Sequence, residues 1–176
     1  MYRGYNQAMH RTVFVLLASC SVLLASCSPA SPTELTPTAP EMVTLSVYFT
    51  NLPRYAIGTE PYEDAVTRTV PTTGSLPEEV LTQLFLGPTD DETAQGLDVF
   101  LSGATGFSEL TIADDVARVY LTGECNSKGA TYTIANLIEA NLRQFPEIQW
   151  VKIYDQNGET ETPDGRSDSI PFCLEP

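Results

Sequence analysis

The sequence predicts a single α+β domain of the split βαβ type (β-α-β-β-α-β), with a mixed or antiparallel sheet that carries two helices on one face. Three observations lead to this fold class. Alternating apolar segments indicate strands at 43–49, in a hairpin at 107–121 and at 148–154. Apolar residues at helical spacing indicate two helices, within 75–89 and 129–145. The order of these elements along the chain is the split βαβ order.

The first strand, 43–49 (VTLSVYF), alternates and is rich in β-branched and aromatic residues. A long loop with proline and glycine follows, and 65–70 (AVTRTV) predicts a second short extended segment. Further along, 89–96 (TDDETAQG) predicts an exposed acidic connection, and the apolar run 97–101 fits neither a helix nor a strand pattern.

The first helix has both ends marked in the sequence. Ser75 and Glu78 have the capping-box spacing, in which a hydroxyl and a carboxylate accept hydrogen bonds from free backbone N–H groups. Pro77 lies in the first turn, where its missing N–H has no cost. Gly87 favours a left-handed C-cap, and Pro88 prevents continuation. The apolar stripe of this helix consists of Val80, Leu81, Leu84 and Phe85.

A hairpin, a second helix and a last strand follow. Segments 107–112 and 117–121 flank an aspartate turn. The helix at 129–145 has a wide apolar face and ends before Pro146. The strand 148–154 (IQWVKIY) completes the expected sheet.

Residues 1–26 predict a lipoprotein signal peptide. Residues 1–11 are basic without acids, and 12–25 are apolar or small. This apolar segment is shorter than the about 20 residues of a transmembrane helix, although an uncleaved anchor remains an alternative. The motif LASC that ends at Cys27 resembles the bacterial lipobox, whose cysteine carries diacylglycerol and becomes the first residue. The same motif ends at Cys20, but cleavage there would leave only about seven apolar residues in the leader. We therefore expect the lipid on Cys27.

The segment 27–42 predicts a tether between this lipid and the domain at 43–176. It is rich in proline, serine and threonine and lacks any periodicity. Acyl chains on Cys27 give stable anchoring, because each buried methylene adds about 0.8 kcal/mol. We expect the chain on the extracytoplasmic face of the cell membrane, in contact with the membrane through the lipid only.

The charge balance is strongly acidic. The full chain has 9 basic and 23 acidic residues. Without residues 1–26, which contain Arg3 and Arg11 and no acid, 7 basic residues remain against 23 acidic ones, a formal net charge of −16. Such a field disfavours nucleic acids and anionic lipid headgroups as partners.

Two cysteines remain in the predicted domain, Cys125 and Cys173. In an exported, histidine-free domain they most simply form a disulfide, which stabilises by about 4 kcal/mol on the chain-entropy model. The alternative, a reactive thiol, needs nearby cations, and Lys128 is the only cation close to Cys125 in sequence.

The sequence predicts no catalytic, cofactor or metal site. The only histidine, His10, lies in the leader, so no Ser–His or Cys–His pair can form in the mature chain. The segment 155–161 (DQNGETE) spaces oxygen ligands like a calcium loop, but it lacks the glycine and the bidentate acid of an EF-hand. Whether this segment binds calcium stays open.

Tyr55 and Tyr62 are the candidate partner surface. Both lie in the long loop after the first strand, and a core does not require tyrosines there. Tyrosine is enriched at protein interfaces because its ring is apolar and its hydroxyl is polar.

Several pieces of the sequence together resemble a GerMN domain, the module named from sporulation and spore-germination lipoproteins. They are VTLSVYF, the arginine of AVTRTVP, the helix end LFLGPT, ARVYLTG and IANLIEANLRQFPEIQWVKIYDQNGE, which together span 43–159. The resemblance implies an α+β envelope domain without established enzymatic activity that assembles or stabilises extracytoplasmic complexes. The long loop before Arg68 and the cysteine pair depart from the common pattern.

Together these observations predict a non-catalytic interaction or scaffold domain of the bacterial cell envelope. Its expected partner is another envelope protein or a cell-wall component such as peptidoglycan. The alternative is an accessory lipoprotein that binds a small ligand or a metal. An apolar pocket would favour that alternative, and an exposed aromatic patch on a filled core would favour the scaffold.

Overall fold

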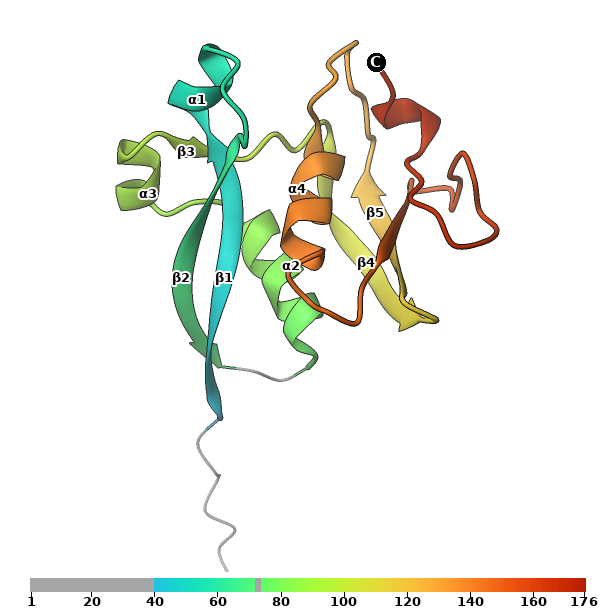
Figure 1. The fold of residues 1–176 in the computed structure, drawn as a ribbon, viewed down its shortest axis with the longest axis horizontal. Coiled ribbons are helices and arrows are strands. Elements are labelled where there is room, and N and C mark those ends of the chain that lie inside the picture. Colours follow the sequence, from blue (N-terminus) through green and yellow to red (C-terminus); the bar gives the residue numbers. More distant parts are fainter. Residues whose placement is uncertain (1–39, 72–73) are drawn as a thin grey trace, which may run out of the picture. The chain divides into compact units, whose positions relative to one another are not determined.

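The structure, a computed structural model, describes residues 40–71 and 74–176 (Figure 1). The predicted signal peptide, Cys20, Cys27 and the tether up to residue 39 lie outside these residues. Within them, no helix has the length and apolar character to cross a membrane. The elements are, in order, β1 (Met42–Asn51), α1 (Leu52–Ala56), β2 (Glu63–Pro71), α2 (Leu76–Leu86), α3 (Asp90–Ala94), β3 (Leu97–Asp98), β4 (Ala104–Ala113), β5 (Val116–Gly123), α4 (Ile134–Leu142), β6 (Trp150–Tyr154) and a 3₁₀ helix (Phe172–Leu174).

The α+β class is confirmed, and the described strands form two three-stranded sheets where the sequence suggested one. The first sheet has the order β2-β1-β3, and both of its pairs are antiparallel. In the second, of order β4-β5-β6, β4 and β5 form the predicted hairpin and β6 runs parallel to β5. β1 therefore does not pair with the hairpin.

Side chains of α4 and its C-terminal turn explain this division, because they occupy the edge of β1 opposite β2. Asn141 is fully buried, its Oδ1 accepts a hydrogen bond from Tyr48 N (2.9 Å), and its Nδ2 donates to Tyr48 O (2.9 Å). Gln144 Nε2 donates to Ser46 O at 3.1 Å. A side-chain amide offers the same donor and acceptor as a peptide group, so it satisfies a strand edge without a further strand.

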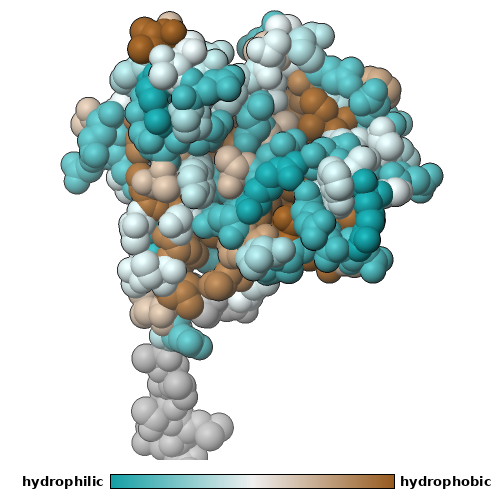
Figure 2. Space-filling model, viewed as in Figure 1, coloured by the Kyte–Doolittle hydropathy of each residue, from teal (hydrophilic) through white to brown (hydrophobic). Residues whose placement is uncertain are grey.

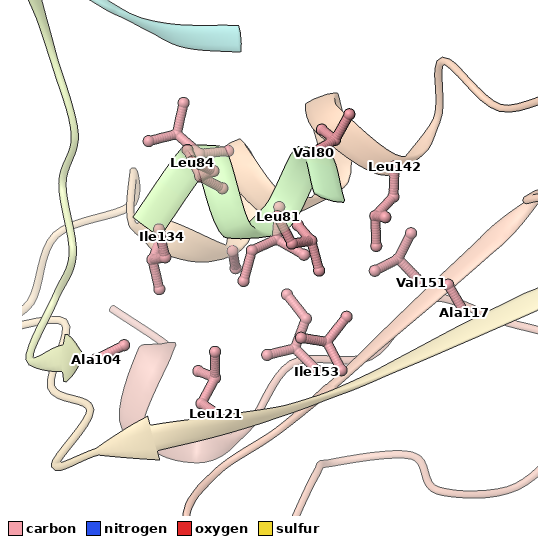
Figure 3. Packing of buried hydrophobic residues seen from close by; sticks show 14 of the residues in the cluster. Val80, Leu81, Leu84, Ala104, Ala117, Leu121, Ile134, Leu142, Val151 and Ile153 are labelled. Carbon is pink, nitrogen blue, oxygen red and sulfur yellow. The ribbon is translucent and has the colours of Figure 1, made fainter. Parts of the chain in front are cut away.

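Helices α2 and α4 lie between the two sheets and contact each other (Figure 1). α2 packs on β1 and β4, and α4 packs on β1 and β6. Buried apolar side chains from both sheets and both helices belong to one cluster. In Figure 3, Leu81 of α2 and Ile134 of α4 point toward Ile153 and Leu121 of the second sheet, and Leu142 of α4 points toward Val151 of β6. The two sheets thus share a single core.

The ends of the two long helices follow from their caps. Ser75 Oγ accepts a hydrogen bond from Glu78 N (3.4 Å), which is one half of the predicted capping box. α2 ends before Gly87 as predicted, but Gly87 has φ of 80° and ψ of 175° and so does not adopt the left-handed helical conformation expected of it. α4 begins at Ile134, later than the predicted 129. The reason is that Lys128 and Gly129 have positive φ angles of 52° and 80°, which a helix does not accept.

Two short helices occupy segments that the sequence predicted as connections. Asn51 caps α1, because its Oδ1 accepts a hydrogen bond from Arg54 N at 2.9 Å. Thr89 and Glu92 form a reciprocal capping box for α3, with Thr89 N donating to Glu92 Oε2 (2.7 Å) and Glu92 N donating to Thr89 Oγ1 (3.3 Å).

Arg68 of β2 ties α2 and α3 to the first sheet. Its guanidinium donates to Gly87 O (2.9 Å) and Gln83 O (3.2 Å) at the end of α2, and it lies 5.0 Å from the centre of the Phe49 ring. The ion pair between Arg68 and Glu92 is largely buried, with side-chain exposures of 12% and 14%. The arginine of AVTRTVP and the glycine of LFLGPT, two pieces of the family resemblance, are therefore hydrogen-bonded to each other.

The first prediction concerns the edge of β1. Asn141→Leu keeps a similar volume but leaves the donor and the acceptor of Tyr48 without their partner. We expect the free energy of unfolding, measured by urea denaturation, to fall by about 2–6 kcal/mol, because each unpaired buried group costs about 1–3 kcal/mol. The exposed Gln149→Leu serves as the control and should stay within about 0.5 kcal/mol. Equal losses in both variants would contradict the role of Asn141.

The second prediction concerns the Arg68–Glu92 pair and pH. Glu92→Gln should lower the free energy of unfolding by about 3–5 kcal/mol at neutral pH, because it leaves a largely buried guanidinium without its countercharge. Asp115→Asn breaks the exposed pair between Asp115 (44% exposed) and Arg166 (59% exposed), and it should lower the free energy of unfolding by less than about 1 kcal/mol.

The same pair sets the pH dependence of the difference. Burial raises the pKa of Glu92, but the hydrogen bonds from Arg68 and Thr89 and the charge of Arg68 outweigh it and hold this pKa below its ordinary 4.5. The stabilisation is thus complete above a pH of about 4.5 and is lost as the pH falls through the lowered pKa. The difference between the native chain and Glu92→Gln should shrink in acid, and a constant difference down to pH 2 would contradict this assignment.

Candidate functional site

Four aromatic rings gather at the end of β1, and we call them the aromatic cluster: Tyr55, Tyr62, Phe100 and Tyr132. Tyr55 contacts the other three with ring centroids 5.1–5.4 Å apart, and Tyr132 lies 5.5 Å from Tyr62 and 5.8 Å from Phe100. Most of these contacts are edge-to-face, which is a favourable geometry for aromatic rings. The four rings come from α1, from the segment before β2, from the β3–β4 connection and from the approach to α4.

Polar contacts hold the long loop that supplies the two predicted tyrosines. Arg54 of α1 donates to Glu63 O (2.9 Å) and forms an ion pair with Asp64. Asn51 Nδ2 also donates to Asp64 Oδ2 at 2.6 Å. Leu52 N donates to Gly96 O (2.9 Å), which fixes the start of α1 against the turn before β3. These hydrogen bonds and this ion pair fix the long loop to β2 and to the turn before β3.

The hydroxyl of Tyr132 connects three parts of the fold. It donates to Glu63 Oε1 at 2.6 Å and accepts from Thr50 Oγ1 at 3.3 Å, and the residue is only 7% exposed. Burial, followed by the hydrogen bond to Glu63, raises the pKa of Tyr132 far above its ordinary value. The phenol therefore keeps its proton at any physiological pH and acts as a fixed donor to Glu63.

Two hollows open beside the aromatic cluster. The Glu63 hollow, of about 470 Å³, is lined by Glu60, Pro61, Tyr62, Glu63, Thr131, Tyr132 and Asn136. The Lys128 hollow, of about 450 Å³, is lined by Tyr55, Phe100, Ser102, Gly103, Glu124, Asn126, Ser127, Lys128, Ala130 and Tyr132. Tyr132 is the residue that the two linings share. Each hollow combines aromatic rings with polar side chains.

The C-terminal segment holds the wall of the Lys128 hollow. Cys125 and Cys173 are joined by a disulfide, with their Cα atoms 5.6 Å apart. Ser127 N donates to Cys173 O at 2.7 Å, and Ser127 Oγ donates to Glu175 O. On the other side, Asn126 N donates to Ser102 O at 2.7 Å. The disulfide thus lies beside the candidate site and fixes one of its walls.

The structure brings the two predicted tyrosines together with residues that sequence reasoning had not assigned. Phe100 lies in the run 97–101, which fitted no pattern. Tyr132 precedes Thr133, which forms a capping box with Asn136 at the start of α4. That capping-box spacing was the one signal in the sequence for the true start of the helix. Glu63 carries no signal in the sequence, because its contact with Tyr132 spans 69 positions.

The calcium-like segment 155–161 is organised by internal hydrogen bonds. Asp155 Oδ1 accepts from Asn157 N (2.8 Å) and Glu159 N (2.9 Å), as in a turn capped by an aspartate. Nearby, the fully buried Lys152 donates from Nζ to Asp164 O at 3.2 Å and also to Thr162 O. Among the described residues, no group of three or more histidine, cysteine, aspartate or glutamate side chains is placed to hold a metal ion.

The third prediction concerns the disulfide. The double variant Cys125→Ser with Cys173→Ser should lower the free energy of unfolding by about 4 kcal/mol, since the bond joins residues 48 positions apart. We also expect faster hydrogen exchange at the amide of Ser127, which donates to Cys173 O, while the amide of Tyr48 stays protected. Unchanged exchange at Ser127 would show that the wall does not depend on the disulfide.

Comparisons with known proteins identify the family of this chain. A family model described as Germane (sporulation and spore germination) matches residues 46–162. No curated protein sequence matches the chain. A similar solved structure is that of the tandem GerMN domains of the sporulation protein GerM from Bacillus subtilis, with 17% identity and a TM-score of 0.46. That match covers 76% of this chain and 49% of the other, so the chain spans about half the length of that structure. The family match, which covers most of the chain and confirms the resemblance seen in the sequence, shows that the chain belongs to the Germane family of sporulation and spore-germination proteins and carries a GerMN-type domain.

Proposed function

We propose that this chain is a lipid-anchored domain on the extracytoplasmic face of a bacterial cell membrane, where it binds another envelope protein or a cell-wall component without catalysis. The observation that carries this proposal is the aromatic cluster, which presents Tyr55 and Tyr62 beside two open hollows. Rings in such a position provide contact area at low cost in side-chain entropy.

The location rests on the leader and on the cysteines. The lipobox-like motif at Cys27 supports lipid anchoring, and a tether of about 16 residues would follow it. The disulfide between Cys125 and Cys173 fits an oxidising compartment outside the cytoplasm. Membership of a family named for sporulation and spore germination is compatible with an envelope role.

The absence of turnover is inferred from the chemistry of the site. Glu63 accepts a hydrogen bond from the Tyr132 hydroxyl, and burial together with this bond raises the pKa of that phenol. The Tyr132 phenol is thereby not poised to exchange a proton near neutral pH, as general acid–base catalysis requires. The hollows are open at the surface, whereas sites that capture small molecules bury most of their ligand. This geometry favours a binding surface over the small-ligand alternative.

The fourth prediction tests this proposal by in-cell crosslinking of the full chain, with analysis of captured proteins and cell-wall fragments by mass spectrometry. We expect envelope material in the native sample and a clear loss of it in the double variant Tyr55→Ala with Tyr62→Ala. The matched control is Tyr120→Ala, because Tyr120 is a half-exposed tyrosine stacked on Tyr154 at 4.5 Å in the other sheet.

Fractionation of the same cells tests the anchor. Cys27→Ser should release the chain from the membrane fraction, and Cys20→Ser should not. Capture of cytosolic proteins alone would contradict the location, and capture that is unchanged in the double tyrosine variant would contradict the role of the aromatic cluster.

A further inference from the structure

The two sheets of the described chain have four edges, and three of them are short, covered or irregular. β3 is two residues long, and the side chains of Asn141 and Gln144 occupy the edge of β1 beyond it. Along β6, Ser169 N donates to Val151 O (3.1 Å), and Ser169 O accepts from Ile153 N (2.8 Å). The register of β4 on β5 is broken twice, as at β-bulges, which hinder the addition of a further strand. Within residues 40–71 and 74–176, the fourth edge, β2, shows none of these features.

The backbone of β2 has open hydrogen-bonding groups along this edge. The strand is nine residues long and pairs with β1 in one unbroken antiparallel register. Opposite residues in such a pair exchange both of their backbone bonds or none. Tyr48 directs its N–H and C=O to Asn141, so its opposite residue, Ala65, points both groups away from β1. Thr67 and Thr69 follow at the period of two. All three residues are exposed, and in the described chain none of them forms a backbone hydrogen bond outside the β1–β2 pair.

The edge of β2 also lacks the charges that usually prevent the addition of a strand. Among residues 65–71, the one charged side chain is Arg68, which is turned to Glu92 and is only 12% exposed. On the face in Figure 2, the margin below α3, where β2 runs in Figure 1, is pale and brown, whereas teal covers much of the rest of this face. Exposed edges of natural sheets usually carry charges or a bulge that keep other strands away. The middle of β2 is therefore open to a further strand.

A second β2 strand fits this edge in one antiparallel register. With Thr67 opposite the Thr67 of a second copy, Ala65 lies opposite Thr69, and each facing pair exchanges two hydrogen bonds. A shift by two residues would place Ala65 opposite Pro71, which has no N–H, and would leave Ala65 O without a donor. Only the register centred on Thr67 uses all the open groups of both strands.

The ends of β2 fit the same register. Glu63 would lie opposite Pro71 of the other copy. The bond that Pro71 cannot donate is not needed there, because Glu63 O already accepts from Arg54 Nη2 at 2.9 Å. β2 itself thus supplies a strand whose open groups and missing donor match this edge.

The acids of β2 favour the antiparallel direction as well. Glu63 and Asp64 lie at one end of the strand. In the register centred on Thr67 they lie at the opposite end from the same acids of the other copy, roughly 26 Å away along the strand at 3.3 Å per residue. That distance exceeds the Debye length of about 10 Å at 0.1 M salt, so their repulsion is largely screened. A parallel strand would place the four acids side by side.

We propose that β2 is a dimerisation edge, on which the β2 strand of a second copy of this chain pairs antiparallel about Thr67. The first sheets of the two copies then form one continuous sheet, and the contact is isologous, as in most two-fold dimers. This inference goes beyond the proposed function and does not depend on it, because none of the residues 65–69 lines either hollow.

Sedimentation equilibrium of the full chain in a non-ionic detergent, from about 1 μM to 1 mM, should show a dimer whose share rises with concentration. Thr67→Lys should weaken dimer formation about tenfold or more, since it places two ammonium groups opposite each other across the two-fold axis. Thr111→Lys, at an exposed position of β4, is the matched control, because it changes the net charge equally. It should associate like the native chain. An equal loss in both variants, or a monomer at every concentration, would overturn the inference.

A cysteine at the two-fold position tests the register in intact cells. Opposite residues in a hydrogen-bonded antiparallel pair have Cα atoms about 5.5 Å apart, within the disulfide range of about 4.4–6.8 Å. Thr67→Cys should therefore give a disulfide-linked dimer on mild oxidation. Thr44→Cys on β1, at least about 14 Å from its copy, and Thr111→Cys on β4 should not. Cross-linking through Thr111→Cys in place of Thr67→Cys would contradict the assignment of the edge.

Hydrogen exchange of the native chain does not depend on the folding of any variant. The amides of Ala65, Thr67 and Thr69 should exchange more slowly as the concentration rises, whereas those of Val66 and Arg68, which face β1, should be protected at every concentration. Fast exchange of the first three in the concentrated sample would overturn the inference. If they are protected in membranes while the isolated chain stays monomeric, the strand of another protein covers the edge, and the inference of a second copy fails.

Discussion

The arrangement of both sheets depends on the Asn141 side chain. It pairs with the N–H and the C=O of Tyr48, and its Nδ2 also donates to Leu137 O, so this fully buried amide has all its groups occupied. A buried polar group that is fully satisfied specifies one arrangement, because any other would leave it unpaired. With α4 held against β1, the following strand β6 lies on the far side of the helix layer and pairs with β5. Asn141, together with Gln144 on the same edge of β1, accounts for the division into two sheets around one core.

The sequence predicted the elements better than their pairing, and the reason is the range of the interactions. α2 and the hairpin carry their signals within a few residues of each other, in a cap, a stripe and a turn. The contact between Tyr48 and Asn141 spans 93 positions, and nothing near either residue shows that a side chain replaces a strand. The site follows the same rule. Tyr55 and Tyr62 were identified from the sequence because a core does not require tyrosines in that loop. Their contacts with Tyr132 could not be predicted, because Tyr132 is 70 or more positions away from both. The capping box of α3, by contrast, is a local signal, because Thr89 and Glu92 are three positions apart. The acidic residues around it favoured the interpretation of this segment as an exposed connection.

The residues that carry the family resemblance and the residues of the candidate site have different roles. Arg68 and Gly87 bond to each other and fasten α2 to the first sheet, so their motif marks a scaffold. Tyr55 and Tyr62 lie in the long loop, outside the pieces of sequence that carry the family resemblance. Family membership therefore identifies the framework, and the chemistry of the loop has to identify the ligand. Related domains with the same framework and a shorter loop would lack this cluster.

The position of β1 has a mechanical consequence. Residue 42 lies at one end of this strand, on the side of the predicted tether, and the loop with Tyr55 and Tyr62 leaves from its other end. At about 3.3 Å per residue, the strand spans roughly 30 Å. Tension between an anchored N-terminus and a ligand held by this loop would pass along the covalent backbone of β1. The β1–β2 hydrogen bonds, the helix layer and the disulfide lie beside that path. A force on the ligand would therefore act first on the covalent backbone of β1 and only then on the non-covalent contacts of the domain.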